Sequence, residues 1–252
     1  MLGLALAGAS ASHAATLSLV NNTNPGQVTG EGQGPEDPRS DYVSQILAGQ
    51  TLYIGIPYSA GAWPSTEATD YFEISTFLLG VGGSSTVSFS FYSASDSGTE
   101  LSGITELDGF TAGTVNIAEA GSGTPMDLGP TAGVTAQIQY ADLTGNPFES
   151  ISNGIVWLGI TNTGSNDVAY YTGDPLGLGE PTPAYQFGGP FDSTATALHA
   201  NTYYYSGGSF VSGNSNVHPY VTINAETIPV PEPDSALLAG LAGLVLLIRR
   251  RN

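Results

Sequence analysis

Short segments that alternate hydrophobic and polar residues recur along most of the chain, from about residue 16 to residue 228. In the clearest segment, residues 86–92, the side chains of Val87, Phe89 and Phe91 share one face, while threonine and serine share the other. Successive side chains of a β-strand point to opposite sides, so this pattern predicts a strand with one buried and one wet face. Glycine, proline, asparagine and aspartate bound these segments, as is typical of turns.

Eight further segments carry the same signal. Residues 71–79 precede the clearest strand across a glycine-rich loop, so we expect an antiparallel hairpin with Phe72, Ile74 and Leu78 in the core. The longest helical candidate covers only residues 41–47. Nine strands fit two packed sheets, which predicts a single all-β domain, an antiparallel β-sandwich or jelly roll. The other candidate strands are residues 51–56, 114–118, 134–140, 155–161, 169–172, 201–205 and 220–224.

The composition agrees with an extracellular β protein. The chain has 34 glycines and 13 tyrosines but only 10% charged residues, whereas surface helices of enzymes usually need glutamate and lysine. It has no cysteine, which excludes disulfides, thiol nucleophiles and cysteine-ligated metals. The domain is therefore expected to depend on its core alone.

The charge of the chain is strongly negative, with 22 acidic and four basic residues and a net charge of -18. Three of the four arginines are Arg249, Arg250 and Arg251, so Arg39 is the one basic residue upstream of them. Binding a nucleic acid requires lysine and arginine to neutralise phosphates, so nucleic acid is excluded as a partner. Such acidity serves solubility, or alternatively attracts divalent cations.

The N-terminus has the features of a secretory signal peptide, which we place at residues 1–14. Residues 2–11 are small and apolar, and residues 12–14 (Ser-His-Ala) supply the small residues that signal peptidase requires. Signal peptides normally begin with a positively charged segment, but no lysine or arginine lies between Met1 and the apolar run. We therefore expect that the natural start lies upstream or that the chain is trimmed. The alternative, a buried N-terminal helix, fits poorly with the strand-like residues 16–20.

The C-terminus combines three physically different segments. Pro231, Glu232 and Pro233 lie in an extended, proline-rich stretch that a processing enzyme can bind as a strand. The apolar residues 236–248 follow and, at about 1.5 Å per residue, form roughly 20 Å of helix. The hydrocarbon core is about 30 Å thick, so snorkelling arginines and local thinning of the bilayer must cover the difference. The arginine triplet, residues 249–251, ends the tail.

The arginine triplet predicts the orientation of the tail in the inner membrane. Under the positive-inside rule, Arg249, Arg250 and Arg251 stay in the cytoplasm, which leaves the rest of the chain on the far side. The N-terminal signal and the tail thus predict the same topology. The domain organisation follows as a signal peptide, an ectodomain over residues 15–228 and a tail over residues 229–252.

This three-part tail resembles the PEP-CTERM sorting signal of Gram-negative bacteria. The resemblance covers about the last 23 residues and implies that exosortase, a membrane cysteine transpeptidase, recognises Pro231, Glu232 and Pro233 and replaces the helix with another attachment. It also implies Sec export, a transient stay in the inner membrane, and delivery to the cell surface or a polysaccharide matrix. The alternatives are a permanent tail anchor or a buried C-terminal helix.

Motifs for catalysis are mostly absent. The chain has no G-x-S-x-G elbow, H-E-x-x-H helix, phosphate-binding loop or dinucleotide fingerprint. His199 and His218 have no recognised nucleophile nearby in sequence and are interpreted as ordinary polar residues. Paired carboxylates of a glycosidase leave no sequence signature, so a secreted hydrolase that acts on polysaccharide remains the alternative function.

Two ligand classes remain as hypotheses. Oxygen-rich residues 162–167 and 31–37 suit calcium, with Asp167 as the candidate ligand, although turns select the same residues. Tyrosines gather late in the chain, and Tyr203 and Tyr205 are expected on one face of a strand with Tyr204 on the other. Flat rings suit sugar stacking, but sheets favour tyrosine regardless of ligand.

The sequence therefore predicts a non-enzymatic, structural, adhesive or carbohydrate-binding protein of the cell surface or extracellular matrix. A third hypothesis is a self-assembling adhesin stiffened by calcium, for which an exposed sheet edge with few charges would be the sign.

Overall fold

The computed structural model describes residues 15–22, 43–59, 67–119, 133–141, 146–152, 154–171, 185–187, 199, 201–215 and 221–229. Within these ranges every regular element is a β-strand, and every strand pairing is antiparallel. The all-β class predicted from the alternating pattern is confirmed. The expected membrane helix, residues 236–248, lies outside the described residues.

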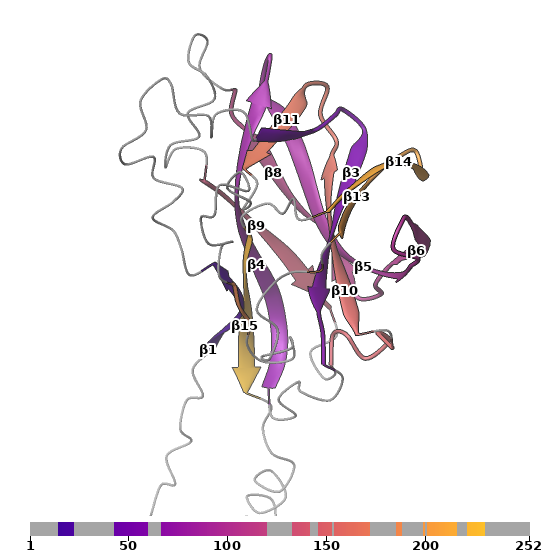
Figure 1. Cartoon of the computed structure of the whole chain (residues 1–252). Helices are drawn as coiled ribbons and strands as arrows, with labels where there is room; N and C mark the ends of the chain where they lie inside the picture. The colour runs from indigo at the N-terminus through magenta and orange to yellow at the C-terminus, as the bar shows by residue number, and fades with distance from the viewer. Residues whose placement is uncertain are drawn as a thin grey trace, which may run out of the picture.

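One sheet has eight strands in this part of the chain, in the order β12-β1-β15-β4-β11-β2, with β9 paired to β4 and β7 paired to β9. Figure 1 shows β1, β15, β4 and β9 of this sheet next to one another. The long strand β4 is its centre, because β15, β9 and β11 all pair with it. The strands are β1 (Ala15–Asn22), β2 (Val43–Ile46), β4 (Glu67–Val81), β7 (Phe110–Thr111), β9 (Gly133–Tyr140), β11 (Asp167–Tyr171), β12 (Tyr185–Phe187) and β15 (Val221–Pro229).

The other sheet has seven strands in the order β14-β13-β3-β10-β5-β6, with β8 paired to β5. Strand β5 pairs with β8 through its first half and with β6 through its second half. The strands are β3 (Gln50–Pro57), β5 (Ser85–Asp96), β6 (Leu101–Glu106), β8 (Gly113–Ile117), β10 (Ile155–Asn162), β13 (Asn201–Ser206) and β14 (Ser209–Ser215).

Each of the nine predicted strands coincides with an observed strand, but two local predictions are wrong. Strands β4 and β5 do not form a hairpin, because they belong to different sheets. The turn between them includes Gly82 and Gly83 at positive φ and carries the chain from one sheet to the other. The helical candidate 41–47 is also wrong, since residues 43–46 form β2 and pair with β11.

The core lies between the two sheets and is built around a group of aromatic rings. Phe72 on β4 contacts Phe91 on β5, with ring centroids 5.2 Å apart, so the contact crosses from one sheet to the other. Phe148, which lies between β9 and β10, contacts both rings at 5.5 and 5.2 Å. Phe72, Ile74 and Leu78 are buried in this core, as the alternation of residues 71–79 predicts.

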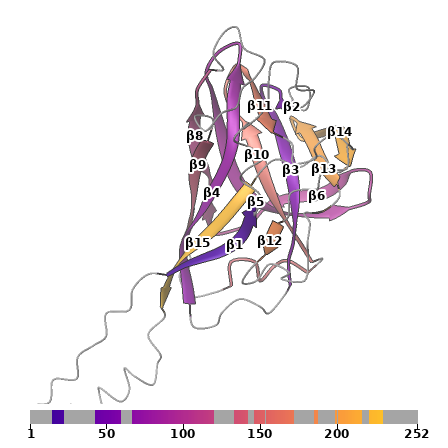
Figure 2. The ribbon, with the colours of Figure 1, turned by 60° about the vertical axis from the view of Figure 1, so that its left-hand side comes forward.

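The two ends of the described fold lie side by side. Strand β1 pairs antiparallel with β15, and Ala15 is opposite Thr227. The chain therefore enters β1 and leaves β15 at the same end of the molecule (Figure 2). The start of β4 is at this end too, because Glu67 is opposite Pro229.

Removing the Phe72 ring tests the importance of the contact between the sheets. We expect Phe72→Ala to lower the free energy of unfolding by about 3–5 kcal/mol, because the cavity opens where the rings of Phe72, Phe91 and Phe148 meet. Urea unfolding followed by tyrosine and tryptophan fluorescence measures this. Phe210→Ala is the matched control, because Phe210 is 40% exposed on β14, and it should cost less than about 1 kcal/mol. Equal losses in the two variants would contradict the assignment.

Candidate functional site

A second aromatic cluster covers the outer face of the seven-stranded sheet, on the side away from the core. The side chains of Tyr53 on β3, Trp157 on β10 and Tyr203 on β13 lie next to one another. Tyr53 is opposite Tyr203 on one side and Gly159 on the other, and the Trp157 ring contacts the Tyr203 ring. Glycine makes room for the rings, because a Cβ at Gly159 would lie 2.5 Å from a ring carbon of Tyr92. Alternation thus places large rings and small residues side by side on this face.

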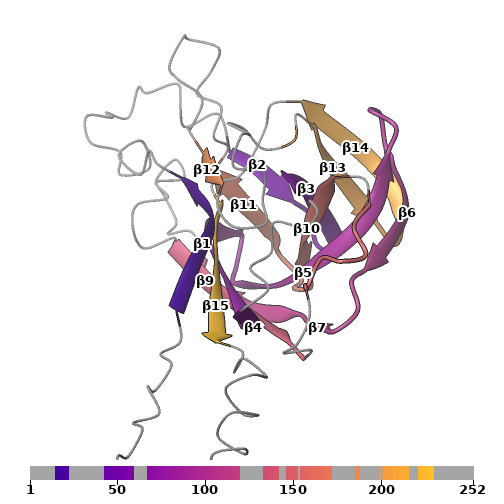
Figure 3. The ribbon, with the colours of Figure 1, turned by 90° about the horizontal axis from the view of Figure 1, so that it is seen from below.

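The β5–β6 hairpin folds over this cluster. Leu101, at the start of β6, is buried among the rings, and its backbone forms two hydrogen bonds with the hydroxyl of Tyr205. Its N–H donates to the hydroxyl at 2.8 Å, and its carbonyl accepts from it at 2.5 Å. Strands β6 and β13 are far apart in the strand order, so the sheet curls until its two sides meet, as Figure 3 shows from below.

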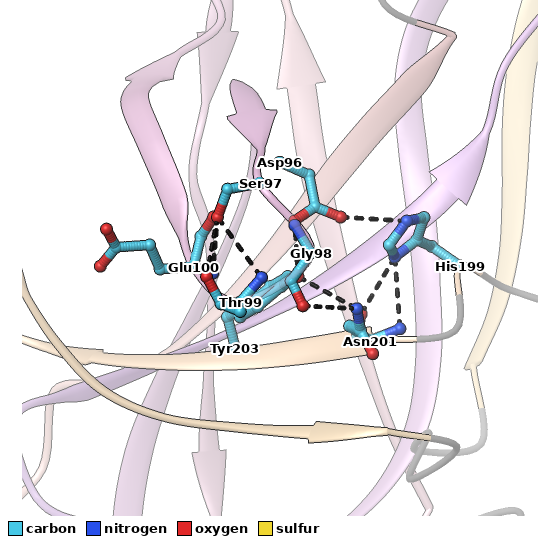
Figure 4. Close-up of polar contacts among 8 residues, drawn as sticks. All are labelled: Asp96, Ser97, Gly98, Thr99, Glu100, His199, Asn201 and Tyr203. Carbon is cyan, nitrogen blue, oxygen red and sulfur yellow. Dashed lines mark hydrogen bonds and ion pairs between the residues drawn. The ribbon is translucent and has the colours of Figure 1, made fainter.

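Asp96 is the polar centre of the docked hairpin (Figure 4). One carboxylate oxygen accepts hydrogen bonds from the Tyr203 hydroxyl at 2.5 Å and from the Gly98 N–H at 2.7 Å. The other oxygen lies 3.1 Å from Nε2 of His199. The Asn201 side chain adds a 3.3 Å hydrogen bond to the Gly98 carbonyl. Asp96 thus joins the hairpin to residues that lie far along the chain.

The Asp96–His199 pair has part of the geometry of a hydrolase triad. Both ring nitrogens of His199 already have partners, however, so neither faces a nucleophile. Nε2 of His199 faces Asp96, and Nδ1 accepts a hydrogen bond from the Asn201 N–H at 3.3 Å. A triad histidine needs one nitrogen for the carboxylate and the other for the nucleophile. Ser97 follows Asp96 directly, but its Oγ bonds Thr99 and the Glu100 backbone within the hairpin loop. The cluster is therefore a docking contact rather than a nucleophile with its base.

Asn162, in the candidate calcium loop, joins both sheets through its side chain. It is fully buried, and its amide oxygen accepts from Ser85 Oγ at 2.8 Å and from the Gly164 N–H at 3.2 Å. Its amide nitrogen donates to the carbonyls of Ile46 and Asn166, both at 2.9 Å. Four hydrogen bonds use the full capacity of the amide. The Asn162 amide is thus fully used by protein groups from both sheets.

Asp167, the candidate calcium ligand, is the first residue of β11. One of its carboxylate oxygens accepts a hydrogen bond from the Ala48 N–H at 3.0 Å. Among the residues described, no group of three or more histidine, cysteine, aspartate or glutamate side chains gathers around a point that could hold a metal. Calcium binding at Asp167 stays a prediction, and residues 31–37 lie outside the described part.

The tyrosine triplet divides between the two faces of β13, as alternation predicts. Tyr204 points into the core, where its hydroxyl bonds the hydroxyl of the buried Tyr170. Tyr203 and Tyr205 point outward but are only 1% and 6% exposed, because the hairpin covers them. Sugar stacking requires an open ring face, so these three rings serve packing.

The sorting and orienting residues, Pro231, Glu232, Pro233 and residues 249–251, lie outside the described part of the chain, as does His218. In the part that is described, no helix is long and apolar enough to cross a bilayer. Sequence reasoning missed Asp96, because no local motif links it to His199. The only signal was the turn-forming Ser97-Gly98 pair that follows it.

Comparisons with known proteins identify no family for this chain. The chain matches no protein-family model, no curated protein and no solved structure. The function must therefore be argued from the residues themselves.

The aromatic cluster predicts a loss of stability in alkali. Burial, followed by the hydrogen bond to Asp96, raises the pKa of Tyr203 to about 12, and burial, followed by the Glu106 charge, raises the pKa of Tyr92 to about 12. The ordinary tyrosine pKa is 10.0, so between pH 10 and 12 the unfolded chain releases protons that the folded chain keeps. The contribution of these two tyrosines to the free energy of unfolding should be complete below pH 10 and be lost as pH rises toward 12.

Urea unfolding at intervals from pH 8 to pH 11.5 measures this slope. Tyr92→Phe removes one ionisable hydroxyl and keeps the ring, so its slope should be shallower than that of the natural chain. An unchanged slope in this variant would show that the alkaline loss has another origin.

The Asn162 side chain gives a separate stability prediction. Asn162→Ala removes all four hydrogen bonds of the buried amide, including those to Ser85 and Ile46, and should lower the free energy of unfolding by about 2–4 kcal/mol. Asn116→Ala is the matched control, because Asn116 is exposed on β8, and it should cost less than about 1 kcal/mol. Thermal and urea unfolding measure both variants. A loss of unfolding free energy in Asn162→Ala no larger than that in Asn116→Ala would contradict the role given to the Asn162 hydrogen bonds.

Proposed function

We propose that the chain is an exported, non-enzymatic protein of the cell surface or extracellular matrix, sorted by exosortase at its PEP-CTERM tail. Sec export through residues 1–14 places the β domain beyond the inner membrane. Residues 236–248 hold it there as a helix until Pro231, Glu232 and Pro233 are processed. The displayed domain then serves a structural, adhesive or carbohydrate-binding role in a polysaccharide matrix.

The observation that carries this proposal is the pairing of β1 with β15. Because Ala15 lies opposite Thr227, the segment before β1 and the tail after β15 leave from one end of the fold. Pro229 ends β15, and only Val230 separates it from Pro231. A domain held at one end in this way presents its faces and its far end to the surroundings. This geometry suits display from a surface.

Two further features support the details of the proposal. The chain passes repeatedly from one sheet to the other, as from β2 to β3, β3 to β4 and β4 to β5. Such connections suit a jelly-roll-like sandwich. The Asp96–His199 pair is occupied by contacts that dock the hairpin, which favours a binding or structural role over hydrolysis.

The sorting proposal predicts a mass change that depends on exosortase. In the native host, the protein should lose the residues after the Pro-Glu-Pro motif and leave the inner membrane only when exosortase is present. Intact mass and fractionation of cells with and without exosortase measure this. Glu232→Ala should keep the tail, whereas Ser235→Ala, a control just beyond the motif, should be processed normally. An intact tail in the inner membrane of exosortase-positive cells would identify a plain anchor.

A further inference from the structure

The outer face of the eight-stranded sheet differs from that of the other sheet, because it carries a row of polar side chains along the middle of β4 and on the strands beside it. Along β4, the outward positions are Tyr71, Glu73, Ser75 and Phe77, and all four are partly exposed. The residues between them point into the core. Each end of this row carries an aromatic ring, and the middle carries a carboxylate and a hydroxyl. At about 3.3 Å per residue, the two rings are roughly 20 Å apart along the strand.

The strands beside β4 extend this row sideways into a polar face. On β15 and β9, the residues opposite the row are exposed or partly exposed amides, hydroxyls and a carboxylate. Both donors and acceptors therefore project from the face. The cross-strand sets are Tyr71 with Glu226 and Gln139, Glu73 with Asn224 and Gln137, and Ser75 with Thr222 and Thr135.

Several of these groups retain unused hydrogen-bonding capacity. Ser75 and Thr135 share one hydrogen bond of 3.1 Å, and Thr16 on β1 donates to Glu226 at 2.6 Å. A hydroxyl can form up to three hydrogen bonds and a carboxylate about four. The remaining sites point to water or to a ligand rich in hydroxyl groups.

The charge of this face restricts the class of ligand. Tyr71 has the carboxylates of Glu226, Glu73 and Asp70 around it, and these charges, after burial, raise the pKa of its hydroxyl. No lysine or arginine occurs in the described ranges to balance them. A polyanion, such as a uronic-acid polymer, would be repelled by this face and by the net charge of -18.

We propose that the outer face of the eight-stranded sheet binds a neutral polysaccharide laid along β4. The apolar face of a sugar ring stacks on Tyr71, and the hydroxyls of the polymer hydrogen-bond Glu73, Ser75 and the flanking amides. The chain thereby runs parallel to β4 over several sugar residues. The inference rests on the proposed surface display only for its biological setting, since binding is a property of the purified protein.

The opposite outer face cannot take this role, because its rings are already used. Tyr203, Tyr205 and Trp157 are covered by the β5–β6 hairpin and have no open face. The structure thus covers the rings of one outer face with its own chain, whereas Tyr71, Glu73 and Ser75 on the other outer face remain partly exposed.

The test is affinity electrophoresis of the full chain, in mild detergent, through gels that contain one polysaccharide each. The panel holds neutral polymers (hydroxyethylcellulose, laminarin, dextran and galactomannan), anionic alginate and cationic chitosan. We expect retardation by at least one neutral polymer that persists in 0.5 M salt, and none by alginate. Tyr71→Ala should weaken the retained interaction at least about tenfold. The control Phe210→Ala removes an exposed ring from β14 and should leave binding unchanged.

A second variant distinguishes a true loss of binding from a folding defect caused by Tyr71→Ala. Gln137→Ala alters only an exposed side chain of β9, so the protein should stay folded and bind roughly threefold more weakly. Melting temperatures verify that each variant is folded. Retardation by none of the neutral polymers, or retardation that both Tyr71→Ala and Gln137→Ala leave unchanged, overturns the inference. Chitosan binding that vanishes in salt and ignores these variants is bulk charge attraction and also overturns it.

The outcomes are independent of sorting. Processing by exosortase without glycan retention would reject this inference and leave the proposed display intact. Retention of a neutral polymer by a chain whose tail is never processed would support the inference and reject the sorting proposal.

Discussion

The contact between Phe72 and Phe91 is the interaction on which the rest of the structure depends, because it packs together two sheets whose strands do not pair with each other. A chain without cysteine has no disulfide to join its sheets, so they are held by such packing and by side-chain hydrogen bonds between them. Consecutive strands that turn an apolar side to the core can face each other from opposite sheets, as β4 and β5 do. The buried Asn162 amide then fixes one corner, where β2, β5 and β10 meet.

The two outer faces differ in their exposure to solvent. One is covered and contributes to stability, and the other is partly exposed and can contact a ligand. The seven-stranded sheet carries Tyr53, Trp157 and Tyr203 outward, so a hairpin must cover them. Docking that hairpin occupies Asp96 and His199, and the Trp157 N–H of the same cluster is buried with no hydrogen-bond partner among the described residues. The covered face is therefore committed to stability. The eight-stranded sheet has polar outward residues that need no cover and remain able to bind.

The sequence predicts what depends on local alternation and misses what depends on partners. All nine candidate strands form, because a period of two is readable within a few residues. The β4–β5 hairpin was wrong, since alternation is the same whether neighbours pair in one sheet or face each other across a core. Residues 43–46 are too few to distinguish a helical from a strand pattern, and β6 and β14 are glycine-containing outer strands with weak signals. Asp96 was missed because its partners, His199 and Tyr203, are brought to it only by the curl of the sheet.

The direction of β4 connects the tether to the proposed binding face. Its first residue, Glu67, lies opposite Pro229, at the end where the tail leaves, and its last residues pair with β11 toward the other end. The row from Tyr71 to Phe77 therefore runs away from the point of attachment. A polysaccharide aligned with this row would extend from the tethered end toward the matrix, and it would not lie across the surface that carries the protein. The same cross-strand register that fixes the core thus sets how a tethered domain could hold a long, flexible ligand.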